Sequence, residues 1–147
     1  MRERTICFDM DGTFVDLYSV RGWLDMLINK ETTPYEIAQP LYDMDEFNEC
    51  LEVLRNKGFR IAIISWCAKA QDKLFDKEIR KAKRAWLKKY NVVADEIHIV
   101  RYGTPKAKTV KGTAVLIDDE AQNLNAWTRG RVIDANQNIL KVLQNFC

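Results

Sequence analysis

Residues 6–13 read ICFDMDGT, and this stretch decides the fold. Its first three side chains are ones that a pleated, buried strand accepts, so we predict a strand over residues 5–8. Asp9 and Asp11 follow where that strand ends, and an extended chain would direct both carboxylates to the same side. Gly12 allows a sharp turn out of the strand. Two such carboxylates are costly unless a cation or a shared proton offsets their charge, which indicates chemistry; a solvated Asp-Gly turn is the alternative.

The length and composition indicate one folded domain over residues 1–147. A chain of 147 residues can bury a real core, and its 47% of hydrophobic residues argues against disorder. No apolar run is long enough to span a bilayer, and residues 1–4 lead directly into the first strand, so we expect neither a membrane partner nor a signal peptide. The four cysteines are widely spaced without a CxxC pair, which favours a reducing, cytoplasmic location.

Strand-like and helical patterns alternate along the chain, with no internal repeat and no linker. This alternation predicts an α/β domain with a mostly parallel sheet. The apolar run at residues 60–65 suits a strand that is covered on both faces, and Gly58 is placed to end the helix before it. The expected strands lie at residues 5–8, 60–65, 96–100, 114–117 and 131–133, and the expected helices at residues 19–29, 45–57, 69–90, 120–128 and 136–145.

Polar residues gather where the predicted strands end. In an open parallel sheet the carboxyl ends of the strands meet at one edge, and ligands bind there. Clustered carboxylates repel one another and need a hard cation, and their oxygens suit Mg²⁺, which also binds phosphate oxygens. One carboxylate can attack phosphorus and a second can protonate the leaving oxygen, while a hydroxyl and a lysine hold the phosphoryl oxygens. The residues expected at this edge are Asp9, Asp11, Ser65, Lys106, Lys108, Asp118 and Asp119.

The order of these motifs, DxDGT followed by a strand-end Ser, a Lys and an acidic pair, resembles the haloacid dehalogenase (HAD) superfamily over about residues 6–134. The resemblance implies a HAD-like, Rossmannoid fold: a five-stranded parallel sheet flanked by helices, with a small cap insertion at residues 14–42. It also implies Mg²⁺-dependent hydrolysis of phosphomonoesters through an aspartyl-phosphate. In that family the first Asp is the nucleophile and the second the general acid and base, which carries over to Asp9 and Asp11. The hydroxyl of the second motif carries over to Ser65.

The resemblance further implies a metal site beside the nucleophile. The metal would be Mg²⁺, held by the side chains of Asp9 and Asp118 and by the backbone carbonyl of Asp11. Asp119 would support these ligands without binding the ion directly. Three residues that adjoin these motifs are expected to support the bound phosphate: Gly12, Thr13 and Trp66.

Two lysines compete for the position beside the phosphoryl group. Lys106 lies nearer the third strand, just inside a Thr-Pro turn at residues 104–105. Lys108 opens the sequence Lys-Thr-Val, which stands before the acidic pair much as in the 5′(3′)-deoxyribonucleotidases of the superfamily. Both stay candidates, and the lysine that does not reach the site is expected to be a solvated surface residue.

The substrate implied by this resemblance is a small phosphorylated molecule. A short cap leaves the site open to a bulky ester, so a nucleotide or a nucleic-acid end is the finer expectation. Residues 69–89 carry nine basic and three acidic side chains, which indicates a phosphate-binding patch or the solvated face of a helix; the lack of interleaved aromatics favours the solvated face. Four aromatic residues in or beside the cap could stack on a ring or simply pack the lid: Tyr18, Trp23, Tyr35 and Tyr42.

Two other functions stay open. One is a HAD fold that has lost catalysis and binds a partner in a regulatory role, although every motif residue is present. The other is a receiver-like phosphoacceptor module, which also uses Mg²⁺, an Asp, a hydroxyl and a Lys. A receiver has its acceptor on the third strand rather than the first, so the DxD sequence after the first strand disfavours it.

Overall fold

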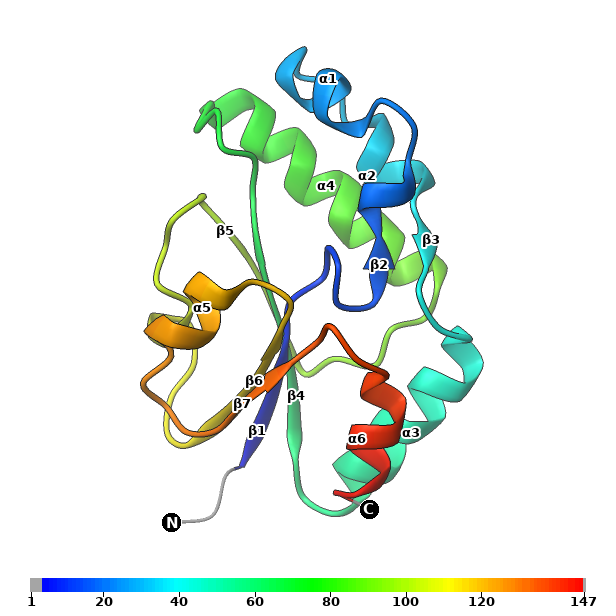
Figure 1. Ribbon diagram of the computed structural model, residues 1–147, viewed down its shortest axis with the longest axis vertical. Helices are drawn as coiled ribbons and strands as arrows, with labels where there is room; N and C mark the ends of the chain where they lie inside the picture. The colour runs from blue at the N-terminus through cyan, green and yellow to red at the C-terminus, as the bar shows by residue number, and fades with distance from the viewer. Residues whose placement is uncertain (1–3, 147) are drawn as a thin grey trace.

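The computed structural model describes residues 4–146, so residues 1–3, where we expected no signal peptide, and Cys147 lie outside the described part. The structure is built on a five-stranded, parallel sheet with the strand order β5-β4-β1-β6-β7 (Figure 1). This confirms the predicted α/β class and the parallel sheet, at the level of a Rossmann-like arrangement. The strands are β1 (Thr5–Phe8), β4 (Arg60–Trp66), β5 (Glu96–Val100), β6 (Ala114–Asp118) and β7 (Val132–Asp134).

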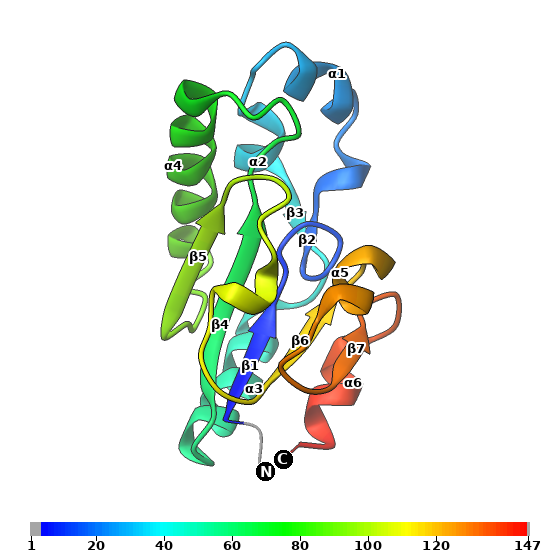
Figure 2. The ribbon, with the colours of Figure 1, turned by 90° about the vertical axis from the view of Figure 1, so that its left-hand side faces the viewer.

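Helices cover both faces of the sheet (Figures 1 and 2). On one face lie α3 (Met44–Asn56), α4 (Lys73–Lys89) and α6 (Ile139–Gln144), and on the other lie α5 (Ala121–Ala126) and the 3₁₀ turn η2 (Lys106–Lys108). The larger core is on the three-helix face, where Phe8 of β1 meets Phe47 of α3 edge-on, with ring centroids 5.6 Å apart. Such buried aromatic pairs add to the stability that apolar burial supplies.

Strand β1 lies in the centre of the sheet, and this decides where polar side chains can meet. Its residues are buried, with Ile6 and Phe8 packed on one face and Cys7 on the other. The register pairs Phe8 with Ile63 of β4 on one side and with Ile117 of β6 on the other. The residues that follow in all three strands therefore emerge together at the carboxyl edge.

The helices predicted outside residues 14–42 are present, and one capping side chain explains where α4 begins. Asp72 accepts hydrogen bonds from the backbone N–H groups of Leu74 and Phe75, at 2.9 and 3.1 Å, so the helix begins at Lys73 rather than at residue 69. The spacing of apolar side chains indicates that a helix is present but does not locate its first residue. None of the described helices combines the length and apolarity needed to cross a membrane.

Residues 14–42, which we expected as an insertion, lie above the carboxyl edge of the sheet (Figure 1). Pro34 lies in the first turn of a short helix, where its missing N–H costs no helical hydrogen bond. That helix packs against α4. The elements of this segment are β2 (Val15–Asp16), η1 (Leu17–Ser19), α1 (Trp23–Ile28), α2 (Thr33–Ile37) and β3 (Gln39–Pro40), of which β2 and β3 pair antiparallel. The helix expected at residues 19–29 is thus shorter than predicted.

Candidate active site

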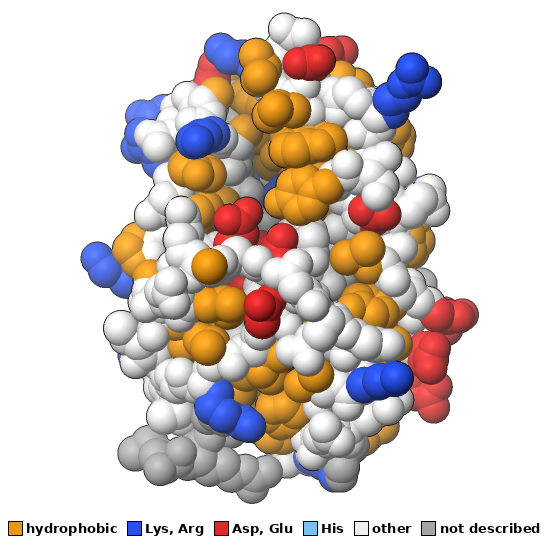
Figure 3. All heavy atoms as spheres, viewed as in Figure 1, with side chains coloured by type: hydrophobic (Ala, Val, Ile, Leu, Met, Phe, Trp, Pro, Cys, Tyr) orange, Lys and Arg blue, Asp and Glu red, His pale blue; other side chains and the backbone are white. Residues whose placement is uncertain are grey.

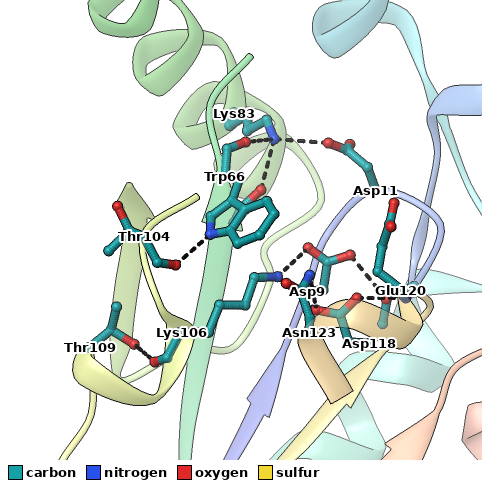
Figure 4. A network of polar contacts seen from close by, with 12 residues as sticks. Asp9, Asp11, Trp66, Lys83, Thr104, Lys106, Thr109, Asp118, Glu120 and Asn123 are labelled. Atoms are coloured by element: carbon teal, nitrogen blue, oxygen red, sulfur yellow. Dashed lines mark hydrogen bonds and ion pairs between the residues drawn. The ribbon is translucent and has the colours of Figure 1, made fainter. Parts of the chain in front are cut away.

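The carboxyl edge of the sheet brings a buried lysine onto two carboxylates (Figure 4). The ammonium of Lys106 donates to Oδ1 of Asp9 and to Oδ2 of Asp118, each at 2.8 Å. Turn η2 directs Lys106 inward, while Lys108 at the other end of the same turn is exposed. Of the two lysines that the sequence left open, Lys106 therefore lies in the site and Lys108 lies on the surface.

Lys106 remains charged between these acids. Burial by itself lowers the pKa of this lysine, but the negative charges of Asp9 and Asp118 outweigh burial and raise the pKa above its ordinary value. Asp118 also accepts hydrogen bonds from the backbone N–H of Glu120 at 2.9 Å and from the side-chain amide of Asn123 at 3.0 Å. Asn123 was not predicted; its place in the helix that follows the acidic pair was the only signal in the sequence.

Asp9, Asp118 and Asp119 form a cluster that fits a divalent cation. Each offers one carboxylate oxygen, and these oxygens lie within 4.8 Å of one another. Burial, together with the charge of Asp9, raises the pKa of Asp118 to about 6 and that of Asp119 to about 8. Oδ1 of Asp119 is buried without a hydrogen-bond partner among the described residues. Crowded carboxylates with an unpaired oxygen are what a hard cation such as Mg²⁺ stabilises.

The turn after β1 shapes this cluster. Gly12 has a φ of +81°, a conformation that L-residues rarely adopt, and a Cβ atom there would overlap the carboxylate of Asp119. Thr13 is fully buried, and its hydroxyl donates to Oδ2 of Asp9 at 3.4 Å. Gly12 and Thr13, two of the three residues expected to support the bound phosphate, thus lie against these carboxylates.

A second buried lysine, Lys83 of α4, enters the site from the opposite side (Figure 4). Its ammonium donates to Oδ2 of Asp11 at 2.8 Å, to Oγ of Ser65 at 2.7 Å and to the backbone carbonyl of Trp66 at 2.9 Å. We expected the basic residues of 69–89 to form a solvated face. This is wrong for Lys83, whose side chain is 1% exposed, whereas the other lysines of α4 are exposed.

The signal for Lys83 was present in the sequence. It stands four residues after Ile79 and three before Trp86, and helical spacing places it on the face that carries these two apolar, buried side chains. A lysine at this spacing can be buried only where acceptors surround its ammonium. The ends of β1 and β4 supply these acceptors, and only the tertiary fold brings the two strand ends together.

Asp11 is the acid that faces Lys83. Burial raises the pKa of Asp11; the charge of Lys83 opposes this increase, and the charge of Asp9 adds to it. A carboxyl group with a raised pKa retains a proton more readily near neutral pH, as a general acid requires. The side chain is 16% exposed and lines a cavity at the carboxyl edge of the sheet.

A cavity of about 380 Å³ opens above these groups, and its walls are largely aromatic and aliphatic. Figure 3 shows acidic side chains at the middle of this face, with hydrophobic side chains directly above them. Trp66, expected to support the phosphate site, forms part of the wall: its indole N–H donates to the carbonyl of Thr104 at 2.8 Å, and its ring packs against Tyr102 at 4.9 Å between centroids. The polar residues of the floor include Asp9, Asp11, Ser65 and Lys106.

Three of the four aromatic residues expected in or beside the cap line this cavity. Tyr18 and Trp23 contact each other edge-on, with ring centroids 5.0 Å apart, and Tyr35 is largely buried. Tyr42 instead stacks on Phe47 in the core. The first three are therefore placed to contact a ligand, whereas Tyr42 packs the protein.

No known protein-family model matches the chain, and no curated protein matches it in sequence. What the chain does is therefore inferred from the geometry of this site and from the order of its motifs.

Proposed function

We propose that this chain is a HAD-type phosphatase that hydrolyses phosphomonoesters, with Asp9 as the nucleophile. One observation supports this above the others. The carboxylate of Asp9 leaves the end of the central strand into the floor of the cavity, between the buried ammonium of Lys106 and the acidic pair at residues 118–119. A carboxylate held in this way has a fixed direction, as a nucleophile requires.

Two half-reactions would share the same pair of acids. In the first, an oxygen of Asp9 bonds to phosphorus while the bond from phosphorus to the leaving oxygen breaks, and that oxygen takes a proton from Asp11. In the second, water attacks phosphorus and gives a proton to Asp11, and the bond between phosphorus and Asp9 breaks. Inorganic phosphate is released, and both acids end the cycle as they began.

Lys106 is placed to stabilise the transferring phosphoryl group. An ammonium has three N–H donors, and two of those of Lys106 go to Asp9 and Asp118. A third can donate to a phosphoryl oxygen, and the positive charge offsets the negative charge that the transition state carries.

Asp9, Asp118 and Asp119, with the backbone carbonyl of Asp11, would hold Mg²⁺. When bound, the ion would offset the charge of the phosphoryl oxygens and the repulsion among the carboxylates. The unpaired, buried Oδ1 of Asp119 and the raised pKa values of the acidic pair support this assignment.

The aromatic walls of the cavity favour a leaving group that carries a ring. The Trp66–Tyr102 pair and the Tyr18–Trp23 pair both border the cavity and offer ring faces and edges to such a group. Residues 14–42 would act as a small cap over the site. A nucleotide, or the phosphorylated end of a nucleic acid, is the substrate class that fits this proposal.

Phosphate release from a panel of esters tests the proposal. The panel contains p-nitrophenyl phosphate, 5′- and 3′-nucleotides, sugar phosphates and a 3′-phosphorylated oligonucleotide, each assayed with Mg²⁺ and with EDTA. We expect release that requires Mg²⁺ and that Asp9→Asn, a nearly isosteric change, abolishes without altering the circular dichroism spectrum. Turnover near the wild-type rate in Asp9→Asn would overturn the assignment of the nucleophile. No release from any ester would favour the catalytically silent binding protein instead.

A further inference from the structure

Lys83 makes three hydrogen bonds, one for each donor that an ammonium possesses. They go to Oδ2 of Asp11, Oγ of Ser65 and the carbonyl of Trp66, at 2.7–2.9 Å. The ring of Tyr35 covers the ammonium from another side, with its centroid 4.6 Å from Nζ. An ammonium so enclosed has no donor left for a substrate, in contrast to Lys106, which uses two donors on carboxylates.

The burial of Lys83 is costly, and packing alone does not explain it. Charged side chains are rarely this buried, and a leucine or methionine would fill a position between Ile79 and Trp86 without desolvating a charge. What the lysine contributes is a link between separate elements. It joins Asp11 after β1 to Ser65 near the end of β4, from a position on α4.

The link through Lys83 leaves one polar group of Ser65 and one of Asp11 available to a substrate. An ammonium only donates, so Oγ of Ser65 accepts from Lys83 and keeps its own hydrogen for another acceptor. Lys83 likewise engages Oδ2 of Asp11 and leaves Oδ1 to carry the proton that a leaving group needs. Both Asp11 and Ser65 line the floor of the cavity.

We propose that Lys83 is a positioning residue of this site: it directs the carboxyl group of Asp11 toward the leaving oxygen and the hydroxyl of Ser65 toward a phosphoryl oxygen, without touching the substrate. This inference rests on the proposed phosphatase function. It adds no chemical step, because the proton passes from Asp11 to the leaving oxygen as before.

A positioned acid has a signature that a structural role lacks. A leaving oxygen that is strongly basic needs the proton of Asp11, whereas p-nitrophenolate is stable enough to leave without it. Losing the position of Asp11 should therefore slow the hydrolysis of an alkyl ester far more than that of p-nitrophenyl phosphate. Benzyl phosphate is a suitable alkyl ester, since it also carries one ring.

The experiment compares kcat/KM for benzyl phosphate and p-nitrophenyl phosphate in Lys83→Met. Lys81→Met, at an exposed position of the same helix, is the matched control. We expect Lys83→Met to lower kcat/KM about 10²-fold for benzyl phosphate and less than about tenfold for p-nitrophenyl phosphate, and the control to match wild type. In Asp11→Asn combined with Lys83→Met, the ratio of kcat/KM for the two esters should equal that in Asp11→Asn alone. Lys83 acts on the leaving group only through Asp11, and any effect through Ser65 is the same for both esters.

The other possible outcomes argue against a positioning role for Lys83. Equal losses for the two esters, or no loss, would overturn the positioning role while the phosphatase stands. Absence of phosphate release in the wild type would overturn both proposals, so the two failures are distinguishable. If circular dichroism shows that Lys83→Met does not fold, Lys83→Gln takes its place with the same expected selectivity, because its neutral amide has two N–H donors and cannot make all three hydrogen bonds.

Discussion

Lys106 and Lys108 carry the same charge and stand two positions apart, yet one of them lies among the carboxylates and the other in solvent. The 3₁₀ geometry of η2 explains the difference. With three residues per turn, side chains two positions apart point about 120° away from each other. When one lysine faces the site, the other must face away, and no property of the two side chains themselves distinguishes them.

Lys106→Ala should lower kcat/KM for phosphate release by about 10²–10³-fold, as the loss of one electrostatic stabiliser of a transition state does. Lys108→Ala should remain near wild type, because its side chain is exposed. Initial rates over a range of substrate concentrations measure both. Similar rates for the two variants would contradict the placement of Lys106 beside the phosphoryl group.

At the scale of whole elements, the helices divide into those that carry site residues and those that only support the sheet. Helix α4 carries Lys83 and α5 carries Asn123, so changes in either helix reach the site. Helix α3 instead buries Phe47, Leu51 and Leu54 in the core. Changes to α3 should therefore alter stability without altering the chemistry.

Asp43, the residue that caps α3, provides the test. Its carboxylate accepts hydrogen bonds from the backbone N–H groups of Asp45 and Glu46, at 3.0 and 3.1 Å. Asp43→Ala should lower the free energy of unfolding by about 1 kcal/mol, while Asp43→Asn, which preserves the cap, should cost less. Urea unfolding followed by circular dichroism measures the difference. A loss of kcat/KM in Asp43→Ala under conditions where it stays folded would show that α3 does affect the site.

At the scale of the whole molecule, the site joins segments that lie far apart in the sequence. The strands run toward the end of the molecule that α1 and α2 cover, and their carboxyl ends lie beneath that cover (Figure 1). Because β1 is central, β4 and β6 deliver their polar ends to either side of Asp9. An ion bound there would connect the ends of β1 and β6 and so stabilise the fold as a unit.

Mg²⁺ should raise the melting temperature, and more so at higher pH. The folded protein retains protons on Asp118 and Asp119 up to about pH 6 and 8, whereas the unfolded chain loses them near the ordinary value of 3.8. Without metal, the folded state thus binds more protons, and these groups make stability fall as the pH rises from about 4 to 8. Mg²⁺ binds the ionised carboxylates and should offset that loss, so its stabilising effect should grow across this range.

Thermal unfolding at about pH 6 and about pH 8.5, with Mg²⁺ or with EDTA, measures this effect. In Asp119→Asn the decline of stability with pH in EDTA should be reduced, because the neutral amide has no proton to lose. An increase in melting temperature on adding Mg²⁺ that is equal at the two pH values would contradict a metal site at these residues. An increase that persists undiminished in Asp118→Asn would contradict it as well.

Most of the elements could be predicted because their signals are local. The apolar runs at β1, β4 and β6 and the helical stripe of α4 follow from the spacing of side chains along the chain. The convergence of Asp9, Ser65 and Asp118 follows from a general property of parallel sheets, whose strand ends share an edge. The sequence could not locate the ends of the helices in residues 14–42, because α2 packs on α4 and α1 packs on α2, and these contacts form only in the folded chain.

By itself, then, the sequence determined the parallel sheet and the edge at which its carboxylates gather, since strand composition and alternation with helices suffice for both. Only the tertiary structure decided that Lys106 rather than Lys108 pairs with Asp9, and that Lys83 is buried against Asp11 and Ser65. The physical reason is the cost of burying a charge. A lysine can leave water only where acceptors are already in place, and these acceptors come from strands that are distant in the sequence and meet only in the folded chain.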